Sequence, residues 1–279
     1  MIVGVVKKII LKDSEPNDVY AIQCFQQSNP NSQIKAYPYD MGMRRIPLIG
    51  EAVILIPGTS ATANPNKRKQ NQTFYYLNPI SLQKNPHNNA LPNSSAVKYT
   101  AAAAGNPGGS GDSEPDLGKG FSERDDIGSL QPFIGDTLIE GRFGHSLRFG
   151  YTPEGSDTTQ IPSWSSSTDN DPITILSNGR KSPGSYNKFI IEDVNDGLAS
   201  IWLSSSQKIT LSPAQTGIGS ADAQSSFDKP TILLNSDRVY LNAKTDVVVL
   251  NSAKDIINST PGWQMEMDKL FTLIEELAS

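Results

Sequence analysis

The acidic residues that could serve as catalytic acids and bases are concentrated in one short stretch of the chain. They are Glu114, Asp116, Glu123, Asp125 and Asp126. A glycosidase needs two such carboxyl groups held rigidly on either side of a cleft. The neighbouring stretch "AAAAGNPGGSGDSEPDLGKG" at 101–120 has little apolar surface to bury. The pattern therefore favours a solvated loop over a catalytic pair.

Other catalytic and ligand-binding motifs are incomplete. His87 and His145 each lack a second histidine nearby, so no histidine metal pair is predicted. Lys119 is followed by Gly120, whereas a P-loop requires serine or threonine there. The stretch "DVNDG" at 193–197 reaches its glycine one residue too early for a calcium loop. A Ser/His/Asp triad built from distant residues stays open, but we predict no enzyme, no catalytic residue, no cofactor and no metal.

Composition limits the classes of partner. The 279 residues carry a net charge of −5, and the basic residues cluster only in the short "NKRKQ" at 66–70, so we predict no nucleic-acid partner. No run approaches the roughly 20 apolar residues that span a bilayer, so we predict no stable membrane insertion. The apolar run after Met1 is too short for a secretory signal, which predicts a chain made in a cytoplasm. The single cysteine, Cys24, excludes an intrachain disulfide and is expected to pack in a strand.

The first 58 residues are typical of a small β-barrel. Strand signals occur in "IVGVVKKIIL", "DVYAIQCF", "QIKAYPYD" and "EAVILIPG", separated by turn-forming stretches. So many strands in so little sequence predict closure into a barrel, because closure removes exposed edges. The apolar and aromatic stretch at 73–82 is a further strand that would complete the barrel. It interrupts a long loop predicted over 59–126.

Hairpin signals return over residues 127–200. The stretch 136–151 predicts a hairpin that turns at Gly141–Gly144, and "PITIL" at 172–176 predicts another strand. The stretch 188–205 predicts a second hairpin, in which Asp196-Gly197 forms a tight turn with positive φ at the glycine.

Residues 201–260 contain a loose repeat. An aliphatic residue followed by asparagine occurs at Leu234, Leu241, Leu250 and Ile257, at intervals of seven, nine and seven. A mean step of eight residues suits a short strand plus a tight corner. Stacked β-turns and an ordinary β-meander both fit this spacing.

The C-terminal residues 261–279 predict an amphipathic helix. Its apolar positions are Trp263, Met267, Leu270, Ile274 and Leu277, at intervals of four, three, four and three. This spacing is the a/d seam of a coiled coil. Two alternatives remain, a helix docked on its own domain and a helix bundle at the end of an oligomer, since a helix this short is marginal alone.

Several stretches resemble one family. The "RRIPLIGEAVILIPG" at 44–58 is similar to the Pro-x-x-Gly-Glu-x-Val strand pair in the OB-fold of the central hub and spike protein of contractile-tailed phages. The stretches "YYLNPISLQKNPHNNALP", "SLQPFIGDTLIEGRFGHSLRFG" and "LNSDRVYLNAKTD" resemble segments of baseplate structural proteins from myoviruses of marine cyanobacteria.

This resemblance implies a mainly β architecture. The expected order is an N-terminal OB-fold that seats the spike on a trimeric hub protein, an intertwined trimeric β-helix or β-prism, and the short helix. Each repeat would add one turn with its aliphatic residue inside, so Leu234, Leu241, Leu250, Ile257 and the helical seam are the expected trimer contacts. Relatives repeat Val-x-Gly every eight residues, and this chain lacks those glycines.

The resemblance implies a virion protein of the tail baseplate, assembled in the host cytoplasm as a homotrimer. It would help the contractile tail to penetrate the host envelope, with a separate spike-tip protein as a further partner. Some relatives carry a lysozyme domain, but the matching interval here lacks residues for an enzyme core, so that activity is not expected. Two alternatives stay open: a receptor-binding or polysaccharide-degrading tailspike, and the equivalent spike of a contractile secretion system.

Overall fold

The chain folds into two units, Met1–Arg124 and Asp125–Ser279. The computed structural model describes residues 2–11, 18–26, 28–59, 72–80, 91–92, 121–122, 126–153, 162–166, 170–179, 189–212, 227, 229–253, 256–260 and 263–278. Most of the long loop predicted over 59–126 lies outside these residues.

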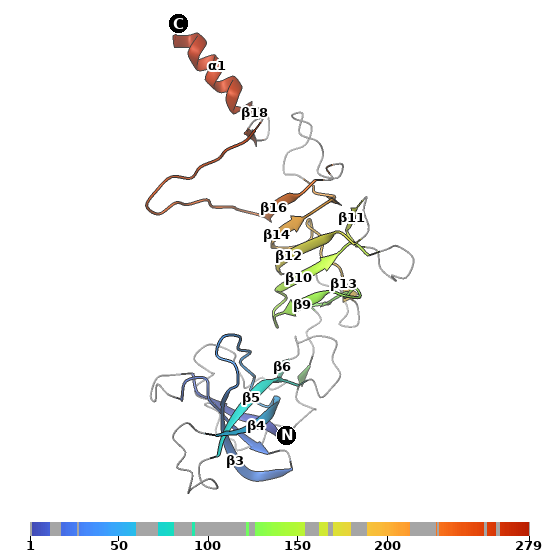
Figure 1. Ribbon diagram of the computed structural model, residues 1–279, viewed down its shortest axis with the longest axis vertical. Coiled ribbons are helices and arrows are strands. Elements are labelled where there is room, and N and C mark those ends of the chain that lie inside the picture. Colours follow the sequence, from blue (N-terminus) through green and yellow to red (C-terminus); the bar gives the residue numbers. More distant parts are fainter. Residues whose placement is uncertain are drawn as a thin grey trace. The chain divides into compact units, whose positions relative to one another are not determined.

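Five strands of the first unit close into a barrel (Figure 1). They are β1 (Ile2–Ile9), β2 (Ile22–Gln26), β3 (Asn29–Pro38), β4 (Ala52–Thr59) and β5 (Gln72–Pro79). The order around the barrel is β1-β2-β3-β5-β4, and pairing of β1 with β4 closes it. Only the β3–β5 pair is parallel. The predicted barrel is therefore confirmed, and the predicted strand at 73–82 completes it as β5.

Apolar side chains from all five strands fill the barrel. The buried set is Val6, Ile9, Ile22, Cys24, Ile34, Ala36, Val53, Leu55 and Tyr76. The register of β1 against β2 shifts between Val6 and Lys8, as a β-bulge does. This shift leaves Lys7 and Lys8 both exposed and returns Ile9 to the interior. The barrel thus buries its apolar residues without burying a lysine. Outside it, the short strands β6 (Leu91–Pro92) and β7 (Phe121–Ser122) pair with each other.

Cys24 packs inside the barrel as expected. Its side chain is 1% exposed, and its thiol donates a hydrogen bond to the carbonyl oxygen of Ile34 at 3.4 Å. Burial raises the pKa of the Cys24 thiol to about 11, because the low-dielectric interior disfavours the thiolate.

We expect Cys24 to be nearly inert toward thiol reagents in the folded protein. The thiolate is the nucleophile, and at pH 8 a thiol with this pKa is only about 0.1% ionised. Reaction with an aromatic disulfide reagent should be at least ~100-fold slower in buffer than in denaturant. Equal rates in the two conditions would contradict the burial of this side chain.

The second unit is built on a five-stranded antiparallel sheet in the order β16-β14-β12-β10-β9 (Figure 1). Its strands are β9 (Thr137–Glu140), β10 (Ser146–Tyr151), β12 (Pro172–Asn178), β14 (Ala199–Ser204) and β16 (Thr231–Ser236). The predicted hairpin at 136–151 is confirmed, because β9 and β10 pair with Glu140 opposite Ser146. Gly144 adopts a positive φ of 92° in the connection, which a glycine accepts without strain.

One face of this sheet is covered by short segments. The covering strands are β8 (Ser129–Leu130) paired in parallel with β13 (Phe189–Ile190), and β11 (Trp164–Ser166) paired with β15 (Gln207–Ile209). The core between the sheet and this layer contains Phe133, Trp164, Ile173, Ile175, Val194, Trp202 and Ile209. The rings of Trp164 and Trp202 meet edge to face, with centroids 5.9 Å apart. Such edge contacts suit the charge distribution of aromatic rings.

The second predicted hairpin, over 188–205, is not formed. β13 pairs with β8, whereas β14 pairs with β12 and β16. Gly197 does not adopt a positive φ, so the expected tight turn at Asp196-Gly197 is not formed. The connection instead buries Val194 in the core and places Glu192 against an arginine, which separates the two strands. Long-range contacts outweigh the local turn signal here.

The C-terminal region consists of a small hairpin and a helix. β17 (Ile257–Thr260) pairs with β18 (Trp263–Glu266), and α1 (Met267–Ala278) follows directly (Figure 1). The helix is therefore shorter than the predicted 261–279, and Trp263 lies in a strand. The reason is the pairing of Thr260 with Trp263 across two residues. Those two residues, Pro-Gly in the sequence, are a turn signal that outweighs the helical spacing.

Candidate assembly interface

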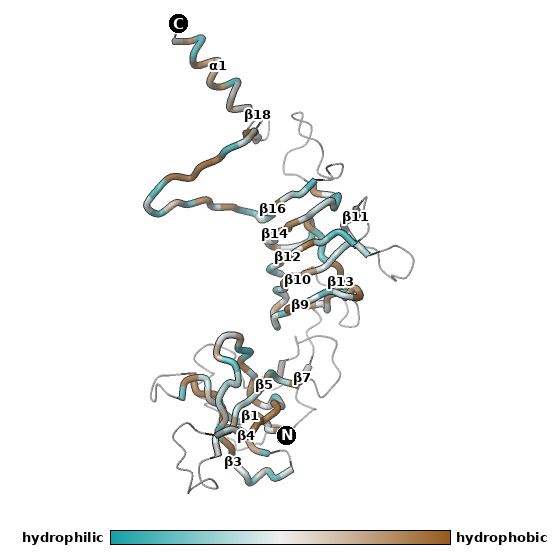
Figure 2. The backbone as a smooth tube through the Cα atoms, in the orientation of Figure 1, coloured by the Kyte–Doolittle hydropathy of each residue, from teal (hydrophilic) through white to brown (hydrophobic). Residues whose placement is uncertain are grey.

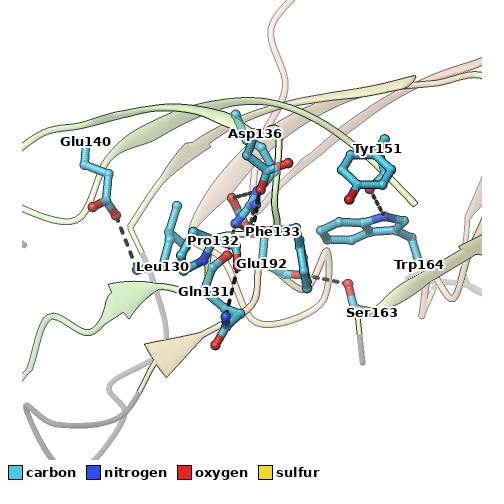
Figure 3. Close-up of polar contacts among 11 residues, drawn as sticks. Leu130, Gln131, Pro132, Phe133, Asp136, Glu140, Tyr151, Ser163, Trp164 and Glu192 are labelled. Atoms are coloured by element: carbon cyan, nitrogen blue, oxygen red, sulfur yellow. Dashed lines mark hydrogen bonds and ion pairs between the residues drawn. The ribbon is translucent and has the colours of Figure 1, made fainter. Parts of the chain in front are cut away.

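The most concentrated buried charge in the described residues surrounds Arg148 of β10 (Figure 3). Arg148 is fully buried and donates from Nε to both carboxylate oxygens of Glu192, at 2.9 and 3.1 Å. Its Nη2 donates to Glu192 Oε2 at 2.9 Å and to the carbonyl oxygen of Gln131 at 2.8 Å. Its Nη1 pairs with Asp136 Oδ2. The guanidinium also lies 5.5 Å from the ring centre of Phe133 and 5.9 Å from that of Trp164.

This cluster fastens the covering segments to the sheet. Gln131, Asp136 and Glu192 come from connections outside β10, and one guanidinium holds all three. Asp136 Oδ2 also accepts a hydrogen bond from the backbone N–H of Phe133 at 2.9 Å. The carboxylates of Asp136 and Glu192 are only 2% and 3% exposed. Their burial with a bidentate partner indicates a structural cluster rather than an open catalytic site.

The other polar candidates from the sequence do not gather into a site. His145 is exposed, and its backbone oxygen accepts a hydrogen bond from Gly141 at 2.8 Å. Asp126 is exposed, while His87, Glu114, Asp116, Glu123 and Asp125 lie outside the described residues. Within the described ranges, no group of three or more His, Cys, Asp or Glu side chains could hold a metal ion. No helix of the described chain has both the length and the apolar character to cross a membrane.

The first candidate interface surface is the segment 237–253, which follows β16. Every one of its residues is exposed, and it forms two arms with a bend at 244–246 (Figure 1). Figure 2 shows apolar stretches along the same tube. The exposed apolar side chains are Val239, Tyr240, Leu241, Val247, Val248, Val249 and Leu250. Among the described residues, no backbone–backbone hydrogen bond involves 237–250.

Such a segment has little to hold it in place within one chain. Fixing the backbone of each residue costs roughly 1–2 kcal/mol, which burial or hydrogen bonding must offset. β-branched residues such as Val247 and Val249 gain stability in strands by packing against neighbouring strands. A partner strand from another chain would supply both the backbone hydrogen bonds and the apolar cover. Leu241 lies in the first arm and Leu250 in the second, so each arm contains one copy of the repeated aliphatic residue followed by asparagine.

Helix α1 exposes a broad apolar face. Counting Met267 as heptad position a, the a, d, e and g positions are all apolar, and they are Met267, Leu270, Phe271, Leu273, Ile274, Leu277 and Ala278. The b and c positions are the charged residues Asp268, Lys269, Glu275 and Glu276. Phe271, Ile274 and Leu277 are 60%, 51% and 79% exposed. Apolar residues at both e and g form a face wider than a two-helix seam, which suits contact with two neighbouring helices.

The structure leaves most of the predicted trimer contacts uncovered. Leu234 in β16, Leu241, Leu250 and Ile257 in β17 are 52%, 63%, 60% and 41% exposed. Met267 and Leu270 are half-buried, and Ile274 and Leu277 are exposed. Sequence reasoning missed Phe271 and Leu273, which widen the helical face. Their apolar character at heptad positions e and g is the sequence feature from which they could have been predicted.

Comparison with known proteins finds no family model that matches the chain, no curated protein and no solved structure similar to it.

Proposed function

We propose that this chain is a structural subunit of a phage tail baseplate, the central hub and spike component that seats on a trimeric hub protein. The observation that carries the proposal is the exposed apolar segment 237–253, which lacks cover within its own chain, as is expected of a segment that pairs with other chains. The function is mechanical, helping a contractile tail to penetrate the host envelope. No catalytic step belongs to it.

The barrel supports the first half of the proposal. A closed five-stranded barrel in the order β1-β2-β3-β5-β4 has the strand arrangement of an OB-fold. The stretch 44–58, whose sequence resembles the hub and spike family, leads into β4. We therefore assign the barrel as the OB-fold that would contact the hub.

The exposed apolar surfaces of the second unit support the other half. In the proposed homotrimer, the arms of 237–253 from three chains pair around one axis as an intertwined β-helix or β-prism. Bundling of three α1 helices then closes the end, with a separate tip protein as a further partner. The virion is the site of this function, and assembly precedes it in the host cytoplasm. The spike of a contractile secretion system shares the architecture and is distinguished by genomic neighbours.

The purified full-length chain is expected to be a trimer. Three chains of 30.2 kDa give about 91 kDa (3 × 30.2), which light scattering can measure. The backbone amides of 237–250 should then exchange slowly with deuterated water, because partner strands protect them. A folded monomer at micromolar concentration with fast exchange in this segment would remove the basis for the shared β-structure.

The location in the particle needs its own experiment. A cryo-EM map of an intact virion that contains this protein should show three copies on the tail axis within the baseplate. Density at a peripheral fibre, or clearing of host polysaccharide by the purified protein, would favour the tailspike alternative instead.

A further inference from the structure

The five-stranded sheet of the second unit has one covered face and one open face. The register places alternate residues of each strand on each face. On the covered face, Arg148, Ile175, Trp202 and Leu233 lie in one cross-strand row. On the open face, one row consists of Ile139, Leu147, Leu176, Ile201 and Leu234, and the next consists of Thr137, Phe149, Thr174, Leu203 and Ile232.

The open face is apolar and uncharged across all five strands. Eight of the ten positions in these two rows are aliphatic or aromatic, and the other two are threonine. Leu176, Ile201 and Leu203 on the central strands are 49%, 38% and 45% exposed. The row beside them contains Asn178, Ala199 and Ser236, and it ends near the exposed His145, which precedes β10. An antiparallel sheet with one face in water ordinarily has apolar residues on its covered face and polar residues on the other. An apolar outer face therefore indicates a surface that a partner covers.

We propose that the open face turns toward the threefold axis of the homotrimer and packs there against the same face of the other two copies. The proposal rests on the homotrimer of the proposed function and names a surface that, apart from Leu234, lies outside the repeat and the helical seam. In a three-sided prism, three apolar sheet faces meet around one axis, and their side chains interdigitate to form the core. Because the face carries no charge, copies of it meet without like-charge repulsion.

Area favours a second copy over an unrelated partner. Five strands about 4.8 Å apart and two rows about 7 Å apart give a footprint of roughly 330 Å². A stable interface buries roughly 800 Å² per partner, so this face alone does not suffice. The missing area is available on the same chain, because β16 lies at the edge of the sheet and runs directly into the exposed arms of 237–253. Arms that pair with another copy bring that copy to the open face.

The lack of charge on the face points to the same occupant. Charged residues around an interface select one partner against others and steer its approach. The two rows of the open face itself offer no such charges, although the chain as a whole carries −5. Selection must therefore come from shape and from continuity with the arms, both of which a second copy supplies.

A single cysteine placed on the open face tests this inference in the full-length protein. Leu176→Cys puts a thiol at the middle of the first row, on the central strand β12. Thr210→Cys is the matched control, since Thr210 is exposed at the end of the covering strand β15. The native Cys24 is 1% exposed and serves as the silent background. Maleimide labelling rates, oxidative cross-linking and light scattering are measured on each variant.

We expect a trimer in which Leu176→Cys labels at least ~10-fold more slowly than Thr210→Cys and oxidises to a disulfide-linked pair. A trimer in which the two cysteines label equally fast would overturn the open-face interface and leave the homotrimer standing. Slow labelling without cross-linking would show that another part of the molecule covers the face, and would also overturn it. A monomer would refute both the interface and the trimer of the proposed function.

A charged variant provides a second measurement. Leu176→Glu with Ile201→Glu places two carboxylates on the open face, where they do not disturb the covered core. The pair is expected to lower the trimer fraction at micromolar concentration at least ~10-fold, because charges buried without partners oppose association. Thr210→Glu should leave it unchanged. An unchanged trimer fraction in the double variant would contradict the interface.

Discussion

Arg148→Met is expected to destabilise the second unit by roughly 3–5 kcal/mol, the cost of breaking a buried ion pair by removing one partner. The variant leaves the carboxylates of Asp136 and Glu192 buried without their cation. It also removes the donors that hold Gln131 and Glu192 against the sheet. In thermal unfolding at fixed protein concentration, the midpoint should fall by roughly 6–20 °C.

Two comparisons separate charge from packing in this prediction. Arg238→Met is the matched control, because Arg238 is exposed and its Nη1 donates a hydrogen bond to the hydroxyl of Tyr240 at 3.1 Å on the surface. It should shift the midpoint by no more than about 2 °C. Adding Asp136→Asn and Glu192→Gln to Arg148→Met removes the two negative charges that are left without a cation. The triple variant should recover part of the lost stability. No recovery would assign the loss to packing of the guanidinium against Phe133 and Trp164.

Leu270→Asp with Ile274→Asp is expected to dissociate the proposed homotrimer or loosen its C-terminal end. Each buried leucine-sized side chain contributes roughly 1.5–3 kcal/mol, so six of them in a three-helix bundle contribute roughly 9–18 kcal/mol. Carboxylates at these d and a positions replace that burial with unpaired charge. Light scattering at micromolar concentration should show smaller species. The barrel is expected to remain folded, because its core contains no residue of α1.

Lys269→Glu is the matched control for this pair. It changes the charge of α1 by −2, as the double variant does, but at a heptad c position outside the apolar face. It should leave the trimer intact. If the double variant assembles and melts like the parent, α1 is a surface appendage, and the proposed spike would need a separate protein to close its end.

The barrel could be predicted from the sequence because its information is local. Runs such as "AVILIPG" carry β-forming residues between turn-forming stretches, and strand existence follows from that pattern. The hairpin of β9 and β10 was predictable for the same reason. Pairing between strands that are far apart in the sequence could not be predicted in this way. The prediction at 188–205 failed because β13 and β14 each find a better partner elsewhere, in β8 and β12.

The candidate interface was predicted only in part. Leu234, Leu241 and Leu250 were predicted as trimer contacts from their spacing, and the structure leaves all three exposed in the single chain. The open face was missed, because its rows join residues that are far apart in the sequence, such as Ile139 and Leu234. Within β14 the alternation is visible, yet apolar residues such as Ile201 and Trp202 occupy both faces. Sequence alternation therefore did not reveal which face is covered.

The sequence by itself determined the mainly β character, the strands of the barrel, the buried position of Cys24 and the amphipathic face of the final helix. These features depend on side-chain periodicity and turn chemistry over a few neighbouring residues. Only the tertiary structure decided that Arg148 holds Glu192, 44 positions away, that Trp263 belongs to a strand, and that one sheet face stays open. Those outcomes depend on contacts between segments that are far apart in the sequence. The free energy of such a contact is a property of both segments together, so neither segment predicts it alone.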